Sequence, residues 1–270
     1  MTIPPTATQP CPTSTDVVTH ALADSTPVSL TELDATAALQ TRVDRKYVLT
    51  PGEVADLLAG IGPGVRVLQI DGSRTFTYAS TYYDTADLVT FHQAARRRRR
   101  RYKVRMRTYV DTGGTFLEVK TRAARGVTVK ERVPTADAGP QLAPQAARFV
   151  DDRLAAARIA APPSSHLAPV LSSHYRRTTL LTHDARVTLD TDLTWRLAPG
   201  PDGVARWADV GGLVVVETKA GTAPSSVDRL LWRAGHRPDR ISKYATGLAV
   251  LRPELPDHPW RRLRRERLAA

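Results

Sequence analysis

The 270-residue chain has little cysteine, little lysine and no long apolar run. Its single cysteine, Cys11, excludes an internal disulfide framework and a metal site built on cysteines. No run of about 18 apolar residues is present, which predicts that no helix spans a membrane. The segment 1–16 (MTIPPTATQPCPTSTD) has neither a basic start nor an apolar core. We therefore expect no secretory signal and a soluble, cytoplasmic protein.

Several common site motifs are also missing. The sequence contains no GxxxxGK[ST] and no GxGxxG, the glycine-rich patterns that cradle phosphates with backbone N–H groups. Any phosphate would therefore be bound by side chains. The seven histidines are scattered without metal-ligand spacing, which argues against a zinc site, and no Ser/His/Asp or Cys/His arrangement stands out.

Positive charge is abundant. The formal net charge is +12, from 39 basic against 27 acidic residues, and this balance indicates an anionic partner of unspecified kind. Lysine and arginine bind phosphate differently, so the few lysines in this arginine-rich sequence indicate positions that need a compact ammonium group. The six lysines are Lys46, Lys103, Lys120, Lys130, Lys219 and Lys243.

The chain divides into three parts. Residues 1–27 are rich in Thr, Pro and Ala and are predicted to be a disordered tail, and residues 256–270 form a basic tail. The part between them, 28–255, is predicted to be one α+β domain, an antiparallel β-barrel with flanking helices. Its predicted strands cover 41–50, part of 61–73, 74–85, 100–110, 115–122, 126–133, 172–181, 185–195 and 213–220. Its predicted helices cover 28–40, 50–60, 85–95, 143–159, 225–236 and a segment from 242.

Six of these strands alternate charged and apolar residues. At period two, one face carries charge and the other carries Val, Leu, Met or Tyr. On a single strand, the usual meaning is a solvated outer face. The other interpretation is a barrel with a charged lumen, and the mixture of cations with Glu and Asp at spacing two favours it. The charged positions are Arg42, Asp44, Lys46, Arg101, Lys103, Arg105, Arg107, Glu118, Lys120, Arg122, Lys130, Arg132, Arg186, Asp190, Asp192, Glu217 and Lys219.

A lumen with many cations needs an anion, because like charges repel strongly where water is excluded. A triphosphate or a polyphosphate chain would need a series of cations. Interleaved carboxylates suit Mg²⁺ or Mn²⁺, which bridges phosphate oxygens. In the six-arginine run 96–101, residues 96–100 are either a solvated surface cluster or partly the start of a strand, and the strand phase places Arg101 toward the lumen.

Nine segments, in order along about 30–250, resemble the VTC domain, the polyphosphate polymerase domain of the vacuolar transporter chaperone family, also found in bacteria. This family belongs to the triphosphate tunnel metalloenzymes. The segments are DRKYVL (44–49), TYYDTADL (81–88), YKVRMRTY (102–109), FLEVKTR (116–122), TVKERV (128–133), HYRRTTL (174–180), ARVTLDTDL (185–193), VVVETKAG (214–221) and SKYATG (242–247). The resemblance implies an antiparallel tunnel barrel lined by Lys and Arg.

The resemblance also implies a set of site residues. The catalytic set is Arg105, Arg107, Lys120, Arg177, Arg186 and Lys219. Further phosphate ligands are Lys46, Lys130 and Lys243. A divalent metal, Mn²⁺ or Mg²⁺, is implied on Glu217, with Glu118 as the second acidic candidate. The family pattern Tyr-x-Arg selects Arg177 over Arg176. The superfamily's ExExK is represented only by Arg42-x-Asp44-x-Lys46, which fits the polymerase branch better than a plain triphosphatase or an adenylate-cyclase-like activity.

The implied activity is transfer of the ATP γ-phosphate to a growing polyphosphate chain, with ATP and polyphosphate as partners. A triphosphatase and a non-catalytic polyphosphate-binding module remain alternatives. Specific nucleic-acid binding is disfavoured by the interleaved Glu118, Asp190 and Glu217 and by the few aromatic residues available for base stacking. A membrane-protein partner, the oligomeric state and the chain length of the product are left open by the sequence.

Overall fold

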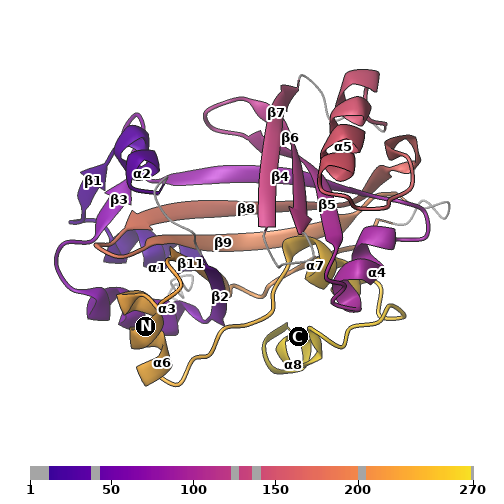
Figure 1. Cartoon of the computed structure of the whole chain (residues 1–270). Helices are drawn as coiled ribbons and strands as arrows, with labels where there is room; N and C mark the ends of the chain where they lie inside the picture. Colours follow the sequence, from indigo (N-terminus) through magenta and orange to yellow (C-terminus); the bar gives the residue numbers. More distant parts are fainter. Residues whose placement is uncertain (1–11, 38–42, 123–127, 136–140, 200–204, 269–270) are drawn as a thin grey trace, which may run out of the picture.

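The structure is a computed structural model that describes residues 12–37, 43–122, 128–135, 141–199 and 205–268. Within these residues one large sheet dominates (Figure 1). Its strands are β1 (Thr26–Val28), β2 (Val43–Leu49), β3 (Arg66–Leu68), β4 (Thr75–Asp84), β5 (Arg101–Tyr109), β6 (Thr115–Arg122), β7 (Thr128–Thr135), β8 (Ala168–Leu181), β9 (Arg186–Leu197), β10 (Trp207–Asp209) and β11 (Val214–Ala220).

Helices lie on both faces of this sheet and at its ends. They are α1 (Ser14–Ala21), α2 (Leu30–Ala37), α3 (Pro51–Ile61), α4 (Val89–Ala95), α5 (Pro144–Ala156), α6 (Ser226–Arg233), α7 (Lys243–Leu251) and α8 (Arg261–Leu263). Two shorter turns are η1 (Ser164–His166) and η2 (Arg264–Leu268). In the described parts of the chain, no helix has the length and apolarity needed to cross a membrane.

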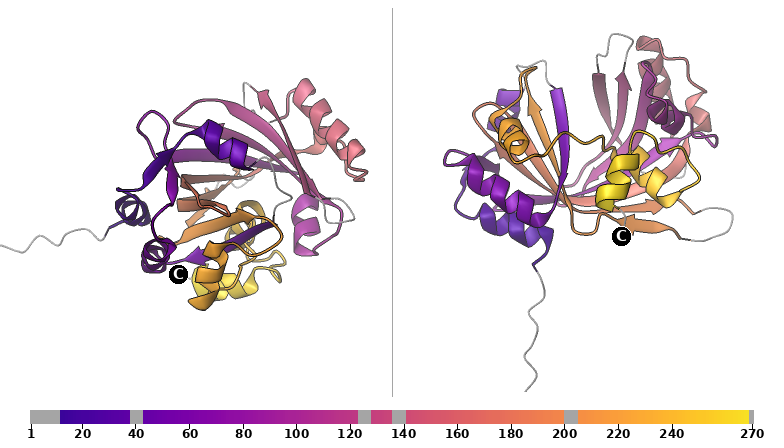
Figure 2. Two further views of the ribbon diagram at one scale, coloured as in Figure 1. Left: turned by 60° about the vertical axis from the view of Figure 1, so that its left-hand side comes forward. Right: turned by 90° about the horizontal axis from the view of Figure 1, so that it is seen from below.

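The strands follow the order β2-β11-β9-β8-β4-β5-β6-β7, and every pair along this path is antiparallel. The sheet curls, so that β2 and β11 stand on one side and β6 and β7 on the other (Figure 2). Among the described residues the edge strands β2 and β7 do not pair, so the sheet is a half-barrel. The predicted α+β class, with an antiparallel curled sheet and flanking helices, is confirmed.

The convex face of the half-barrel carries two apolar clusters. The apolar positions of β2, β9 and β11, such as Tyr47, Leu189 and Val216, pack against α1, α3 and α6. Those of β5 and β6 pack against α5. Because successive side chains of a strand point to opposite faces, burying these positions turns the charged positions of the same strands to the concave face.

Capping residues place several helices where the sequence predicts them. The Thr50 hydroxyl accepts a hydrogen bond from the Glu53 amide, and the Glu53 carboxylate accepts one from the Thr50 amide, so α3 begins where it was expected. Asp84 caps α4 in a similar way, since its carboxylate accepts hydrogen bonds from the amides of Thr90 and Phe91.

The chain ends differ from the expected tails. Residues 1–11 and Arg42 lie outside the described residues, but 14–21 form α1 and 26–28 form β1. A capping box between Thr13 and Asp16 begins α1, and buried Val18 holds the helix on the sheet. The segment was predicted to be disordered from its Thr- and Pro-rich composition, and the capping box within it was not recognised.

The basic C-terminal segment is likewise packed. Trp260 and Leu263 are spaced one helical turn apart and are buried in the cluster around α7. Arg267 pairs with Glu53 of α3 at 3.2 Å. Two apolar residues therefore hold this highly charged segment on the fold, and counting charges alone did not reveal them.

Candidate functional site

The concave face of the half-barrel carries charged side chains from seven strands, which are β2, β11, β9, β8, β5, β6 and β7, with β4, which is uncharged up to its final residue Asp84, between β8 and β5. Strand register builds it residue by residue. Lys46 lies opposite Glu217, Asp190 lies opposite Arg177, and Arg105 lies opposite Glu118. The six sequence-predicted alternating strands therefore contribute to one surface. This outcome excludes a charged outer face as the general arrangement of these strands. Asp192 is the exception, because the β8–β9 register shifts beside it and its carboxylate accepts hydrogen bonds from Ser14 and Thr15 of α1 on the convex face.

The floor of this face is organised by Asp190, which is fully buried. Arg177 binds it with two N–H groups, Nε to Oδ1 at 2.5 Å and Nη2 to Oδ2 at 2.8 Å. Lys243, from the start of α7, contacts Oδ2 as well. Burial alone would raise the pKa of Asp190, but Arg177 and Lys243 hold it well below its usual range. Asp190 is thus a permanent anion that positions two cations.

A second carboxylate has the same role on one arm of the half-barrel, which is formed by β5, β6 and β7. Glu118 accepts Nε and Nη2 of Arg105 on Oε2 at 2.7 and 2.5 Å, and Nζ of Lys130 on Oε1 at 3.1 Å. Burial opposes its ionisation, yet Arg105, Arg107 and Lys130 lower its pKa to about 2. Both oxygens are engaged by cations, so Glu118 fixes their positions.

Glu217 lies on the opposite arm, which is formed by β2 and β11, between two lysines. Its Oε1 is 3.7 Å from Nζ of Lys46 and its Oε2 is 3.2 Å from Nζ of Lys219. Burial opposes ionisation of Glu217, but Lys219 and Lys46, with Arg177 and Lys243 farther away, keep its pKa well below its usual range. These contacts are looser than those of Asp190 and Glu118.

The two arms face each other through their lysines. Loss of water around its ammonium group, followed by repulsion from Lys120, Lys46, Arg105 and Arg101, lowers the pKa of Lys103 to about 7. Lys46 belongs to β2, and the others belong to β5 and β6, so cations of both arms share one space. An anion placed there would relieve this repulsion.

Aromatic rings support the arginines. Tyr78 and Tyr175 stack with ring centroids 5.3 Å apart, and the Arg177 guanidinium lies 5.1 Å from the centroid of Tyr78. The Tyr175 hydroxyl accepts a hydrogen bond from Arg107 Nη2 at 2.9 Å. Stacking and hydrogen bonding hold these flexible cations in place before any ligand binds.

Helix α7 lies on the concave face and brings Ser242 and Lys243 to the site. The Ser242 hydroxyl caps the helix through the Ala245 amide at 3.2 Å and accepts a hydrogen bond from Lys103 Nζ at 2.6 Å. The helix packs closely on Trp195. A Cβ added to Gly247 would lie 2.5 Å from the Trp195 ring, so only glycine fits this approach.

We expect Gly247→Ala to destabilise the fold by about 1–3 kcal/mol and to weaken triphosphate binding, because α7 would shift away from Trp195 and carry Lys243 with it. Urea unfolding followed by tryptophan fluorescence would measure the loss. Gly52→Ala in α3 is the matched control, because nothing lies within 4 Å of the added Cβ. Equal stability of the two variants would contradict the close packing of α7.

Most residues implied by the family resemblance meet on the concave face. Lys46, Glu217 and Lys219 form one group, Arg177 and Lys243 meet at Asp190, and Arg105 and Lys130 meet at Glu118. Arg107 binds Tyr175, and burial together with the charge of Lys46 lowers the pKa of Lys120.

Arg186 lies at the edge of the group, where it pairs with Asp34 of α2 at 3.2 Å. Arg177 is partly buried beside Asp190 and Arg176 is exposed, in agreement with the choice of Arg177.

Two residues were not included in the expected set. Period-two alternation places Lys103 with Arg105 and Asp190 with Arg186 among the charged positions, but the family resemblance assigns neither of them a role. Their importance becomes visible only when their partners, Ser242 and Arg177, are placed beside them.

The fit of a divalent metal depends on Glu217. Among the described residues, no group of three or more His, Cys, Asp or Glu side chains is arranged to hold a metal ion. Mg²⁺ nevertheless often binds through one or two carboxylates together with substrate phosphates. Glu217, ionised and loosely paired, fits that mode, whereas both oxygens of Glu118 are already engaged.

Comparison with known proteins places the chain in a family. The family model of the VTC domain matches residues 41–252. The chain belongs to the VTC domain family. The resemblance seen in the nine sequence segments is confirmed, and the match covers the half-barrel strands from β2 to β11 together with α7. Family and site together support a protein that handles phosphates.

Solved structures similar to this VTC domain share little sequence with it. The proposed adenylyl cyclase HpAC1 from Hippeastrum, described as having a dominant triphosphatase activity, is 16% identical with a TM-score of 0.49, covering 78% of this chain and 96% of that chain. A proposed adenylate cyclase from Bacillus halodurans is 14% identical with a TM-score of 0.47, covering 77% and 96%. PH1819 from Pyrococcus horikoshii is 13% identical with a TM-score of 0.44, covering 78% and 98%. The search of curated proteins gave no match.

Proposed function

We propose that this VTC domain is a polyphosphate polymerase-like phosphotransferase that moves the γ-phosphoryl group of ATP to the end of a polyphosphate chain held on the concave face. The observation that carries this proposal is the state of the three buried carboxylates. Asp190, Glu118 and Glu217 all have pKa values held below the usual range by adjacent cations. They are therefore weak bases.

A weakly basic site favours a nucleophile that needs no deprotonation. The terminal phosphate of a chain is already anionic, whereas water attacks best when a base accepts its proton. In the proposed step, an oxygen of the chain end bonds to the γ-phosphorus of ATP. The bond from that phosphorus to the β–γ bridging oxygen breaks, and ADP leaves with the electron pair.

The side chains of the face position the reactants and stabilise charge. Arg105 and Arg177 are held by carboxylates and aromatic rings, so their free N–H groups are already oriented toward the face. Lys46, Lys219 and Lys243 add point charges along it. Mg²⁺ or Mn²⁺ on Glu217 would neutralise phosphate oxygens when bound. Catalysis then consists of alignment and charge stabilisation.

Product analysis tests this proposal. The protein is incubated with ATP and Mn²⁺, and ADP, free phosphate and polymer are quantified by gel and by phosphate release. Polymer formed in proportion to ADP would support the transferase. Free phosphate without polymer would assign a triphosphatase, and tight polyphosphate binding without turnover would assign a binding module. Both of these outcomes would overturn the proposal.

A pH dependence of triphosphate binding is expected from Lys103. Its pKa is about 7 in the ligand-free face, because burial and neighbouring cations disfavour the charged form. A bound anion favours that form, so binding takes up a proton above pH 7. Affinity for tripolyphosphate should therefore fall as the pH rises, by up to about tenfold per pH unit for one proton.

Calorimetric titration between about pH 6 and about pH 9 measures this dependence. Tripolyphosphate itself gains charge over this interval, so the reference is Lys103→Arg, which keeps its charge throughout. The affinity of the native protein should decline relative to this variant as the pH rises. Parallel pH profiles would show that Lys103 is not in the binding face.

A further inference from the structure

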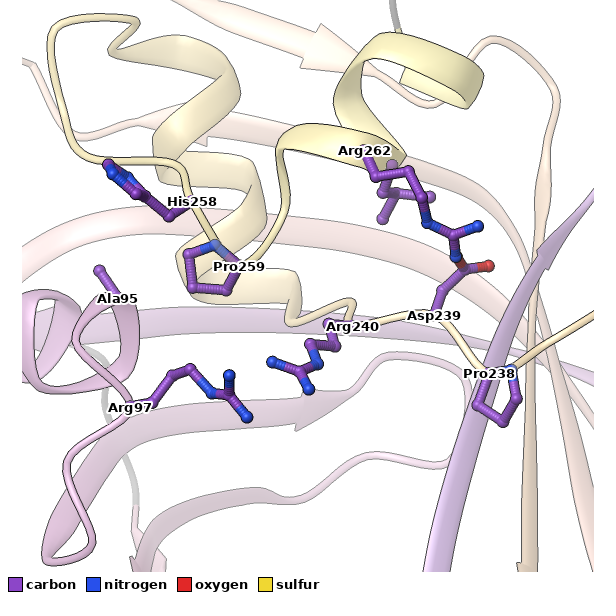
Figure 3. A pocket seen from close by; sticks show the side chains of 9 residues that line it. Ala95, Arg97, Pro238, Asp239, Arg240, His258, Pro259 and Arg262 are labelled. Carbon is purple, nitrogen blue, oxygen red and sulfur yellow. The ribbon is translucent and has the colours of Figure 1, made fainter.

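A separate cavity of about 300 Å³ lies between the end of α4, the segment before α7 and the C-terminal segment. This volume is at the lower end of the range of small-molecule sites. Figure 3 shows its side chains, which include four basic groups and one acid. The lining residues are Ala95, Arg97, Pro238, Asp239, Arg240, His258, Pro259, Arg262 and Leu263.

The charges of this cavity do not balance. Asp239 is occupied, because its Oδ1 accepts Nη2 of Arg262 at 3.1 Å and its Oδ2 accepts the Val48 amide at 3.0 Å. Arg97 and Arg240 have no carboxylate within ion-pair distance in the part of the chain that the structure describes. Their guanidinium groups point toward each other across the cavity (Figure 3). Two facing guanidiniums leave room and charge for an anion.

The cavity adjoins the end of the concave face. The Asp239 amide donates to the Lys46 carbonyl in β2, and the same segment continues into Ser242 and Lys243. On the other side, the charge of Arg97 contributes to lowering the pKa of Arg101, after burial and the charge of Arg122. Basic side chains therefore continue from the concave face to the cavity.

We propose that this cavity is a second anion site, which holds phosphate groups of a polyphosphate chain beyond the part bound on the concave face. The identification of polyphosphate as the occupant of the cavity rests on the proposed function. Arg97 and Arg240 would each offer paired N–H groups to phosphate oxygens, a geometry that guanidinium matches well. A chain long enough to reach the cavity would gain contacts that a triphosphate cannot reach.

Arg97 permits a clean test because of its backbone. Its φ is 55° at the end of α4, where its amide donates to the Ala94 carbonyl at 3.1 Å. Arg158 has φ 52° at the end of α5, and its amide donates to the Ala155 carbonyl at 2.9 Å. Glycine is preferred at such positions. Arg→Gly therefore removes either guanidinium without backbone strain, and Arg158→Gly is the matched control away from the cavity.

The experiment measures the affinities of tripolyphosphate and of long-chain polyphosphate at constant ionic strength. For the double variant Arg97→Gly/Arg240→Gln, long-chain affinity should fall by about tenfold or more while tripolyphosphate affinity changes by less than about twofold. Arg158→Gly should bind both as the native protein does. Native long-chain affinity in the double variant, or an equal loss for both anions, would overturn the cavity site.

An orthophosphate titration separates this proposal from the proposed function. If the native protein binds neither tripolyphosphate nor long-chain polyphosphate, then the proposed function is wrong and polyphosphate is not the occupant of the cavity. Phosphate-dependent thermal stabilisation that is present in native protein and lost in the double variant would then still support an anion site for free phosphate. Identical stabilisation of the two proteins would overturn the site itself.

Discussion

Replacing Arg105 with methionine is expected to lower the rate of ATP-dependent polyphosphate formation by about 100- to 1000-fold. Arg105 is held by Glu118 through two hydrogen bonds and lies opposite Tyr82 of the neighbouring strand β4. It is therefore preorganised before the phosphates arrive. Methionine preserves much of the apolar stem, but it removes every donor from this position.

Initial rates of ADP and polymer formation would measure the effect. Arg148→Met on the exposed side of α5 is the control, and it should keep the native rate. Arg105→Lys should fall between native and methionine, because an ammonium group keeps the charge and loses the planar pair of donors. A native rate in Arg105→Met would remove this residue from the site, while a loss of fold in circular dichroism would assign it a structural role.

Asp190→Asn is expected to cost about 3–5 kcal/mol of unfolding free energy, the usual effect of removing one partner from a buried ion pair. Arg177 and Lys243 would remain next to each other on the floor of the face without their shared anion. Urea unfolding measures the loss. Asp152→Asn on the surface of α5 is the matched control and should leave stability unchanged.

Added tripolyphosphate should restore much of the stability of Asp190→Asn, because it supplies negative charge to the same two cations. Removing one of these cations as well, in Asp190→Asn/Lys243→Met, should recover part of the loss without ligand. If the single variant is as stable as native protein, Asp190 does not carry the charge balance of the face. If the second substitution adds its full cost, the two residues act independently.

Much of the fold could be predicted because its signals are local. Alternation of Arg105 and Arg107 with Val104 and Met106 marks β5, and the Thr50 capping box marks α3. Both features depend on neighbouring residues and on backbone periodicity. The N-terminal helix was missed for the converse reason, since its stability comes from contacts such as Thr15 with Asp192, which lies far along the chain.

By itself, the sequence determined the long strands, though not the short β1 and β10, as well as the charged positions of those strands and the resemblance to the VTC domain. Only the tertiary structure decided that the charged faces of these strands turn toward one another. Alternation creates two faces on each strand, and the packing of α3, α5 and α6 on the apolar face leaves the other face concave. Placement of α7 then joins Lys243 to Asp190, across a separation in sequence that no periodicity encodes. Folding brings these cations closer together than their repulsion would allow without the interleaved carboxylates of Glu118, Asp190 and Glu217.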